Sequence, residues 1–234
     1  MFSSYQFQAN KYILTTKQIL IIMGKINQGI LGGFSGKVGT VVGGNWKGIN
    51  YMRVLTKPTN PNSEKQQNQR TKFSLVMSFL KPINPFLRVG YKLFTAKQTA
   101  FNAAMSQVLT NAVVGELPNS TIDFSLVQVS KGTLSPATGA AATYDSGEIS
   151  ISWIDNSGAT MANITDKALV VVYNDTKSDA VYEMAGVTRP KALQTIPLPA
   201  EWVGDSVQVY LGFITEDGKN VANSVFVGAV EVLA

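Results

Sequence analysis

Residues 206–214 read Ser-Val-Gln-Val-Tyr-Leu-Gly-Phe-Ile, with an apolar side chain at every second position. Side chains alternate between the two faces of a β-strand, so this pattern predicts a strand with one buried face. The buried face would consist of Val207, Val209, Leu211 and Phe213. Residues 148–154 show the same alternation and would turn three side chains inward, namely Ile149, Ile151 and Trp153.

Short apolar or alternating segments recur through the rest of this half of the chain. They are residues 123–129, 168–173, 180–184, 192–196 and 224–232. Turn sequences such as Asp145-Ser-Gly and Glu216-Asp-Gly-Lys lie between segments of this kind. Seven short strands at this spacing predict an all-β sandwich of about 115 residues.

The first half of the chain begins with a glycine-rich segment, because nine glycines lie within residues 24–56. Two strands are predicted at residues 37–42 and 46–54, around a Gly-Gly-Asn turn at residues 43–45 that tolerates positive φ. Alternation along the second strand would place two sets of side chains on opposite faces. One face would carry Lys47, Ile49, Tyr51 and Arg53, and the other would carry Trp46, Asn50 and Met52. The sequence leaves open whether these strands pair within one chain or between two chains.

Helices are predicted between this hairpin and the sandwich. Residues 57–62 read Lys-Pro-Thr-Asn-Pro-Asn, a break after which a helix begins with Asn60 or Asn62 as its N-cap. The first half of that helix is polar, and its second half carries an apolar stripe at Phe73, Val76, Met77 and Leu80. A short amphipathic segment follows, and then a third helix over residues 97–113. The predicted fold class is therefore α+β: a glycine-rich hairpin plus helices, followed by an all-β sandwich of about seven strands.

Charge is divided unevenly along the chain. Residues 1–115 contain 14 Lys and Arg but a single acidic residue, Glu64. Residues 116–234 contain 14 Asp and Glu against six Lys and Arg. The chain is therefore interpreted as a basic module over residues 23–115 and an acidic sandwich over residues 116–234. Residues 1–22 are predicted to be a non-native upstream extension or disordered, with Met23 as the natural start.

The composition argues against catalysis. The sequence contains no Cys and no His, which excludes thiolate zinc sites, Cys nucleophiles and Ser-His-Asp triads. A carboxylate-based enzyme, such as a glycosidase, stays open as a minor alternative, although no pair of carboxylates stands out. Asp145 with Glu148, and Asp175 with Asp179, are interpreted as surface loops and not as calcium sites. We therefore predict that the protein is not an enzyme and has no catalytic, cofactor-binding or metal-binding residues.

The sequence also lacks the signal of a membrane-spanning helix. The apolar segment at residues 19–23 falls far short of the roughly 18 residues that a span requires. No small-x-small cleavage site follows this segment. The sequence therefore favours a cytoplasmic location over secretion, while the compartment stays open.

Basic and aromatic side chains are interleaved along residues 37–97. The residues selected as interaction candidates are Trp46, Lys47, Tyr51, Arg53, Arg70 and Lys72. The leading hypothesis is a non-enzymatic structural or interaction protein that docks on a protein partner, or on another copy of itself, through this basic module. Spaced cations with aromatic rings also hold single-stranded nucleic acid, so a nucleic-acid-associated protein is the alternative.

The second half resembles a fibronectin type III or immunoglobulin-like domain. The resemblance is carried by the strand that contains Trp153, by residues 166–173 (Asp-Lys-Ala-Leu-Val-Val-Val-Tyr) and by residues 199–204 (Pro-Ala-Glu-Trp-Val-Gly). The sequence departs from that pattern at Tyr210, whose parity places it opposite Val209 and Leu211. The resemblance implies a scaffold or binding module and no intrinsic activity.

The first half resembles an uncharacterised Bacteroidota domain-of-unknown-function family. Residues 23–43 read Met-Gly-Lys-Ile-Asn-Gln-Gly-Ile-Leu-Gly-Gly-Phe-Ser-Gly-Lys-Val-Gly-Thr-Val-Val-Gly. Trp-Lys-Gly follows at residues 46–48, and residues 60–73 read Asn-Pro-Asn-Ser-Glu-Lys-Gln-Gln-Asn-Gln-Arg-Thr-Lys-Phe. Members of the family begin where Met23 stands, and the resemblance covers residues 23–234. It implies no activity and no functional residues.

Overall fold

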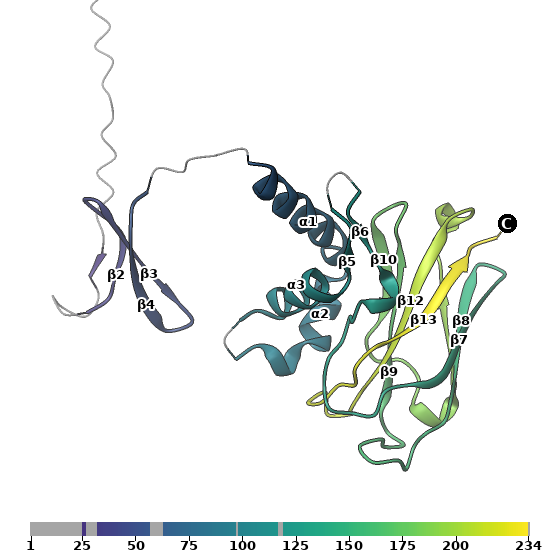
Figure 1. The fold of residues 1–234 in the computed structure, drawn as a ribbon. Helices are drawn as coiled ribbons and strands as arrows, with labels where there is room; N and C mark the ends of the chain where they lie inside the picture. The colour runs from purple at the N-terminus through teal and green to yellow at the C-terminus, as the bar shows by residue number, and fades with distance from the viewer. Residues whose placement is uncertain (1–24, 27–31, 57–62, 97, 117–118, 234) are drawn as a thin grey trace, which may run out of the picture. The chain divides into compact units, whose positions relative to one another are not determined.

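The computed structural model describes residues 25–26, 32–56, 63–96, 98–116 and 119–233. Contacts divide the chain into two compact units, Met1–Asn60 and Pro61–Ala234, which we call the N-terminal unit and the C-terminal unit (Figure 1). The boundary expected from charge, after residue 115, falls at a different place because the helices pack with the sandwich. The predictions for residues 1–22 and for a start at Met23 lie outside the described residues.

The N-terminal unit contains a small antiparallel sheet. Its strands follow one another in chain order: β1 (Lys25–Ile26), β2 (Phe34–Val38), β3 (Val41–Trp46) and β4 (Ile49–Val54). Each strand pairs with the next one along the chain. In this structure the glycine-rich strands therefore pair within one chain.

The predicted turn at residues 43–45 is wrong, because these residues lie inside β3. The turn of the β3–β4 hairpin is Lys47-Gly48, where φ is 47° and 84°. Positive φ at both central residues is the condition of a type I′ turn, which matches the twist of the flanking strands. Trp46 is therefore the direct partner of Ile49 and lies on the same face as Ile49, contrary to the predicted alternation.

Gly43 and Gly44 serve close packing and not chain reversal. A Cβ atom at Gly43 would overlap the Phe34 carbonyl oxygen and lie 2.6 Å from the Phe34 ring. A Cβ atom at Gly44 would lie 2.7 Å from the Tyr51 hydroxyl oxygen. The two glycines thus let aromatic side chains from both neighbouring strands lie across β3, one on each face.

The C-terminal unit begins with three α-helices: α1 (Glu64–Leu80), α2 (Asn84–Gly90) and α3 (Ala100–Asn111). The N-cap of α1 is Ser63, and the predicted caps Asn60 and Asn62 lie outside the described residues. The α3 N-cap is Thr99, whose side chain accepts a hydrogen bond from the Asn102 amide.

The buried stripe of α1 differs from the predicted one. Val76, Phe79 and Leu80 are buried, whereas Phe73 and Met77 are exposed. The stripe formed by Val76, Phe79, Leu80 and Ile83 has the same helical spacing as the predicted stripe. Periodicity alone cannot choose between two such stripes, and packing against the sheet makes the choice.

Seven strands form the sandwich, as predicted. The larger antiparallel sheet has the order β10-β9-β12-β13 and the smaller one β11-β8-β7. Their bounds are β7 (Thr138–Asp145), β8 (Glu148–Ile154), β9 (Lys167–Asn174), β10 (Asp179–Glu183), β11 (Leu193–Pro197), β12 (Ser206–Ile214) and β13 (Val225–Glu231). A two-stranded sheet, β5 (Val113–Val114) with β6 (Thr121–Ile122), joins α3 to the sandwich.

The strand predicted at residues 123–129 is wrong. This segment contains the 3-10 helix η2 (Phe124–Leu126), and the seventh strand is instead β7. The sequence of β7, Thr-Gly-Ala-Ala-Ala-Thr-Tyr-Asp, carries mostly small side chains, so its alternation has little contrast in hydrophobicity. Val127 and Val129 pack with the helices, which explains the apolar character that suggested a strand.

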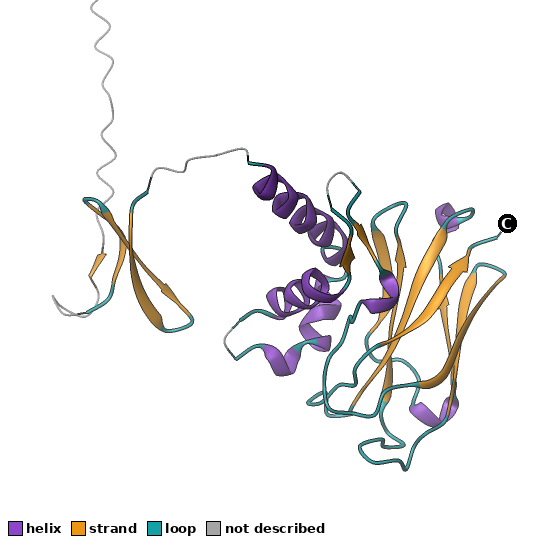
Figure 2. Cartoon of the chain, viewed as in Figure 1, coloured by secondary structure: helices purple, strands orange, loops and turns teal. Residues whose placement is uncertain are grey.

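The larger sheet is buried on both faces. One face joins the sandwich core, where the predicted inward side chains of β8 and β12 are all buried, including Trp153 and Phe213. The other face packs against the helices through Tyr173 and Tyr210, and the Phe79 ring lies 4.7 Å from the Tyr173 ring. The C-terminal unit therefore has three layers, which Figure 2 shows as helices, larger sheet and smaller sheet. The α+β fold class is confirmed.

Candidate interaction surface

One face of the N-terminal sheet gathers three of the six predicted interaction residues. Strand register aligns Lys37 with Val42 and Val42 with Arg53, and it pairs Gly44 with Tyr51 and Trp46 with Ile49. Paired residues share a face, and so do residues two apart along a strand. We call this surface the basic face, defined as Lys37, Val42, Gly44, Trp46, Ile49, Tyr51 and Arg53.

Large apolar side chains at the centre of the basic face are exposed. The exposed fractions are 53% for Trp46, 69% for Ile49 and 49% for Tyr51. The cations Lys37 and Arg53 are also exposed and lie in the neighbouring row of the sheet. The basic face therefore has an apolar centre with positive charge beside it.

The opposite face is exposed as well. Met52 and Val54 are 67% and 65% exposed, and all six residues of β4 are exposed. Every element described in residues 32–56 is a strand of this one sheet, so the unit supplies no second layer of its own there. A small sheet needs a packed apolar face for independent stability. The exposed faces of this sheet are accordingly suited to a partner.

Two side-chain hydrogen bonds order the end of the β3–β4 hairpin, next to Trp46. The Asn45 side-chain amide donates a hydrogen bond to the Asn50 side-chain oxygen over 2.7 Å. The Gly48 amide donates to the Asn45 side-chain oxygen over 3.1 Å. Sequence reasoning missed this role of Asn45, whose signal was its position just before a Trp-Lys-Gly hairpin end.

The six predicted interaction residues fall into two groups. Trp46, Tyr51 and Arg53 lie on the basic face, and Lys47 lies in the adjoining turn. Arg70 and Lys72 belong to α1 of the C-terminal unit, where Arg70 is exposed and Lys72 is half-buried. The candidates thus belong to two units and not to one element.

A second cationic feature lies among the helices. Lys81 and Arg88 line a groove of about 480 Å³ together with Met77 and Phe101. The groove opens between α1, α2 and α3. Two of the basic residues of the helical layer therefore lie beside apolar side chains in this groove.

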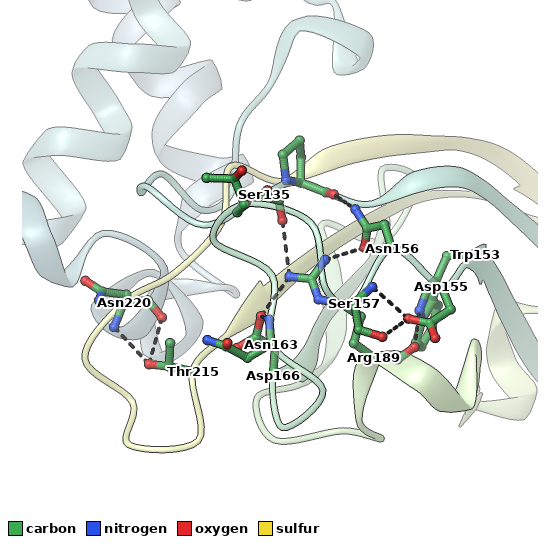
Figure 3. Close-up of polar contacts among 12 residues, drawn as sticks. Ser135, Trp153, Asp155, Asn156, Ser157, Asn163, Asp166, Arg189, Thr215 and Asn220 are labelled. Carbon is green, nitrogen blue, oxygen red and sulfur yellow. Dashed lines mark hydrogen bonds and ion pairs between the residues drawn. The ribbon is translucent and has the colours of Figure 1, made fainter.

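The sandwich holds a buried polar cluster that sequence reasoning missed. Arg189 lies in the 3-10 helix η3 (Arg189–Lys191), and its guanidinium pairs with the Asp166 carboxylate over 3.0 Å. It also donates to the Asn156 side-chain oxygen over 2.7 Å and to the Ser135 carbonyl oxygen over 3.2 Å (Figure 3). The Phe213 ring lies beneath it, 3.8 Å from its central carbon.

This cluster is structural in character. The Arg189 and Asp166 side chains are 0% and 1% exposed, so both are shielded from solvent. Burial lowers the pKa of Arg189, and the hydrogen bond that its guanidinium donates to Asp166 opposes that shift. The Trp153 indole donates to the Arg189 carbonyl oxygen over 2.8 Å, which ties the cluster to the sandwich core. The arrangement closes one end of the sandwich and places no reactive group at the surface.

Metal-binding clusters and membrane-spanning helices are absent from the part of the chain that the structure describes. Within it, no three acidic side chains gather closely enough to hold a metal ion. None of the helices described there has the length and apolar character needed to cross a membrane.

Comparisons with known proteins identify a family. A family model described as a family of unknown function, DUF6266, matches residues 33–228. No curated protein matches the chain. Among solved structures, the fn3 domain of human collagen alpha-1(XX) chain is similar, with a TM-score of 0.33 and 12% sequence identity, covering 43% of this chain and 87% of that one. Because the family model spans both the N-terminal sheet and nearly all of the sandwich, the chain belongs to the DUF6266 family.

Proposed function

We propose that this protein is a non-enzymatic structural or interaction protein that assembles through the basic face of its N-terminal sheet. The observation that carries the proposal is the exposure of Trp46, Ile49 and Tyr51 together on one face. Contiguous exposed apolar side chains of this size mark association sites in soluble proteins. Tryptophan, tyrosine and arginine are also the residue types that dominate binding energy at interfaces.

The sheet itself supports the same proposal on energetic grounds. Burying Trp46 and Ile49 against a partner would contribute about 1.5–3 kcal/mol for an aliphatic side chain and more for the larger indole. The type I′ turn and the Asn45 contacts order the backbone of the hairpin that carries Trp46 before binding. A preordered surface loses less conformational freedom on association, which favours affinity.

Light scattering of the full chain tests this proposal directly. The wild type is expected to show masses above the 25.2 kDa of one chain, rising with protein concentration. Ile49→Ser and Trp46→Ala should each return the mass to that of one chain. The matched control is Ile164→Ser, which removes a side chain of nearly equal exposure, 66% against 69%, from the C-terminal unit. A wild type that stays monomeric at every concentration would overturn self-assembly.

Nucleic-acid binding is the second candidate function. Lys37 and Arg53 lie on the same face as the exposed rings of Trp46 and Tyr51, the combination that binds single strands. Fluorescence anisotropy with a labelled single-stranded DNA, measured across a salt series, separates the two functions. True phosphate contacts give a steep linear loss of log affinity with log salt. A shallow slope, or no binding at low salt, would leave protein association as the function.

We further propose that the protein has no catalytic activity, that it comes from a Bacteroidota source and that it is located in the cytoplasm. A carboxylate-based activity is the weakest of the alternatives, since the buried carboxylate of Asp166 is committed to Arg189. Assay of the purified chain against a panel of glycosides would test the proposed absence of catalytic activity.

A further inference from the structure

One end of the sandwich is strongly acidic. Four segments lie at this end: the β7–β8 turn, the β9–β10 turn, the segment before β12 and the end of β13. In the larger sheet, Val207 pairs with Asn174 and Ser206 pairs with Glu231. In the smaller sheet, Pro197 pairs with Glu148. Seven acidic residues lie there: Asp145, Glu148, Asp175, Asp179, Glu201, Asp205 and Glu231. Lys177 is the one basic residue in these segments, and it pairs with Asp205 over 2.6 Å.

Exposed apolar side chains lie among these carboxylates. Val203 is 44% exposed and Leu233 is 64% exposed. The Gly204 amide donates to the Val232 carbonyl oxygen over 2.7 Å, and the Val232 amide donates to the Asp205 carbonyl oxygen over 3.0 Å. These backbone bonds hold the two segments side by side. We call this surface the acidic pole, defined as Glu201, Val203, Asp205, Glu231 and Leu233.

The opposite end of the sandwich has a different charge pattern. There Asp166 pairs with Arg189 over 3.0 Å, and Asp217 pairs with Lys219 over 3.0 Å. Lys167 and Lys191 add further cations at that end, where Asp155, Glu183 and Glu216 are the other acidic residues. The acidic excess of the sandwich is therefore greater at the end that contains the acidic pole, where seven acidic residues lie with one lysine.

We infer that the basic face of one copy docks on the acidic pole of a second copy. This inference rests on the proposed function and names the partner surface. Both surfaces have exposed apolar side chains at the centre with charges of one sign around them, and the two signs are opposite. Protein interfaces combine an apolar centre with a polar rim in this way, and complementary rims set register and speed encounter.

The geometry of such a contact has a consequence for assembly. Because the two surfaces are different, a docked pair still has one unused acidic pole, on the copy whose basic face is engaged, and one unused basic face, on the other copy. A contact of this heterologous type closes into a ring or continues into a filament. A symmetric dimer through paired basic faces would instead bring Arg53 and Lys37 of both copies together, which like charges disfavour.

Paired charge reversals test the inference. The face variant carries Lys37→Glu and Arg53→Glu, and the pole variant carries Glu201→Lys and Glu231→Lys. Each variant alone should stay at the mass of one chain in light scattering, because its own face and pole now have the same sign. We expect each double reversal to weaken association by about a hundred-fold or more. The matched control, Glu116→Lys with Glu216→Lys, has the same net charge as the pole variant and should assemble like the wild type.

Mixing the two variants provides the decisive result. The unchanged basic face of the pole variant fits the unchanged acidic pole of the face variant, and the two reversed surfaces also fit each other. The mixture should therefore assemble although neither variant does so alone, a recovery that misfolded variants could not show.

Each failure has its own meaning. A pole variant that assembles like the wild type would overturn the acidic pole as the docking site while leaving the basic face in its proposed function. Failure of the mixture to assemble would overturn the pairing of these two surfaces. A monomeric wild type, or a face variant that assembles normally, would overturn the proposed function as well.

Discussion

At the scale of single residues, Arg189 is the side chain on which the C-terminal unit depends most clearly. Its guanidinium is fully buried and is held by Asp166, Asn156 and the Ser135 carbonyl oxygen. Removing one member of a buried ion pair leaves the other as an uncompensated charge in a medium that solvates it poorly. The cost of such a change exceeds the net stabilisation that the intact pair provides.

The first prediction is that Arg189→Met lowers the free energy of unfolding by about 3–5 kcal/mol. The measurement is urea unfolding followed by tryptophan fluorescence. Lys191→Met, an exposed neighbour in the same 3-10 helix, should change stability by about 0.5 kcal/mol or less. The explanation fails if the two variants lose the same stability. Adding Asp166→Leu to Arg189→Met should recover part of the loss, since the orphaned carboxylate is then gone.

The second prediction concerns acid stability at Asp205. A hydrogen bond from Lys177, followed by one from Asn174, lowers the pKa of Asp205 below its usual value. A carboxyl group with a lowered folded pKa stabilises the fold above its unfolded pKa, near 4, and this contribution is lost as pH falls through the lowered folded pKa. The melting temperature of the wild type should therefore drop between about pH 5 and about pH 2 more than that of Asp205→Asn.

Circular dichroism melts across this pH range measure the difference. Hydrogen bonds with nearby Ser and Thr side chains also lower the pKa values of Asp155 and Asp217. The Asp205→Asn variant should therefore still lose some stability as pH falls. The control is Asp175→Asn, the same chemical change in the neighbouring loop outside the Lys177 pair. Parallel curves for the wild type and Asp205→Asn would contradict the role assigned to this carboxylate.

At the scale of elements, β3 shows how glycines can build a strand. Gly43 and Gly44 lie in the middle of the strand and accommodate Phe34 on one side and Tyr51 on the other. The two positions differ in what a new side chain would meet. At Gly43 the obstacle includes backbone, the Phe34 carbonyl oxygen, whereas at Gly44 it is the far end of the Tyr51 side chain.

The third prediction follows from this difference. Gly43→Ala should disrupt the N-terminal sheet, while Gly44→Ala should be tolerated because the Tyr51 ring can move aside. Hydrogen exchange of peptides from residues 41–54 measures the effect, and we expect exchange to be about ten-fold or more faster in Gly43→Ala than in Gly44→Ala. Equal exchange in both variants would show that the Phe34 contact does not limit the strand.

At the scale of the whole molecule, the helices and the sandwich form one compact unit. Tyr173 and Tyr210 of the larger sheet are buried against the helical layer, and the Tyr210 hydroxyl donates to the Phe124 carbonyl oxygen over 2.9 Å. A sandwich without its helices would expose this apolar face. The charge boundary after residue 115 therefore separates elements that depend on each other for burial.

The fourth prediction compares two truncated chains. Residues 61–234 should unfold in one cooperative transition with the stability of the full chain's C-terminal unit. Residues 116–234 should aggregate or bind a hydrophobic dye, because the uncovered sheet face exceeds the apolar patches tolerated on soluble surfaces. Differential scanning calorimetry and dye binding distinguish the two. A stable, monomeric chain of residues 116–234 would show that the helices are dispensable.

Much of the fold was predictable from local pattern, because inward apolar side chains recur at every second residue along strands β8 and β12. Their predicted bounds, 148–154 and 206–214, agree with the structure, and the inward side chains are all buried. The same pattern did not predict β7, because its alanines give little contrast in hydrophobicity between the two faces of the strand. It wrongly predicted a strand at residues 123–129, whose apolar side chains pack with the helices. Of the candidate interaction residues, Trp46, Tyr51 and Arg53 share a face, but Trp46 was assigned to the wrong one.

Local sequence thus specified six of the seven sandwich strands, the helices and the separation of charge, since these depend on periodicity and composition along the chain. Three-dimensional packing alone established which stripe of α1 is buried, that the larger sheet is covered on both faces, and that Arg189 meets Asp166. It also brought carboxylates from four separate segments to one end of the sandwich. The physical reason is that strand register and layer packing join residues far apart in the chain, and no local period records those contacts.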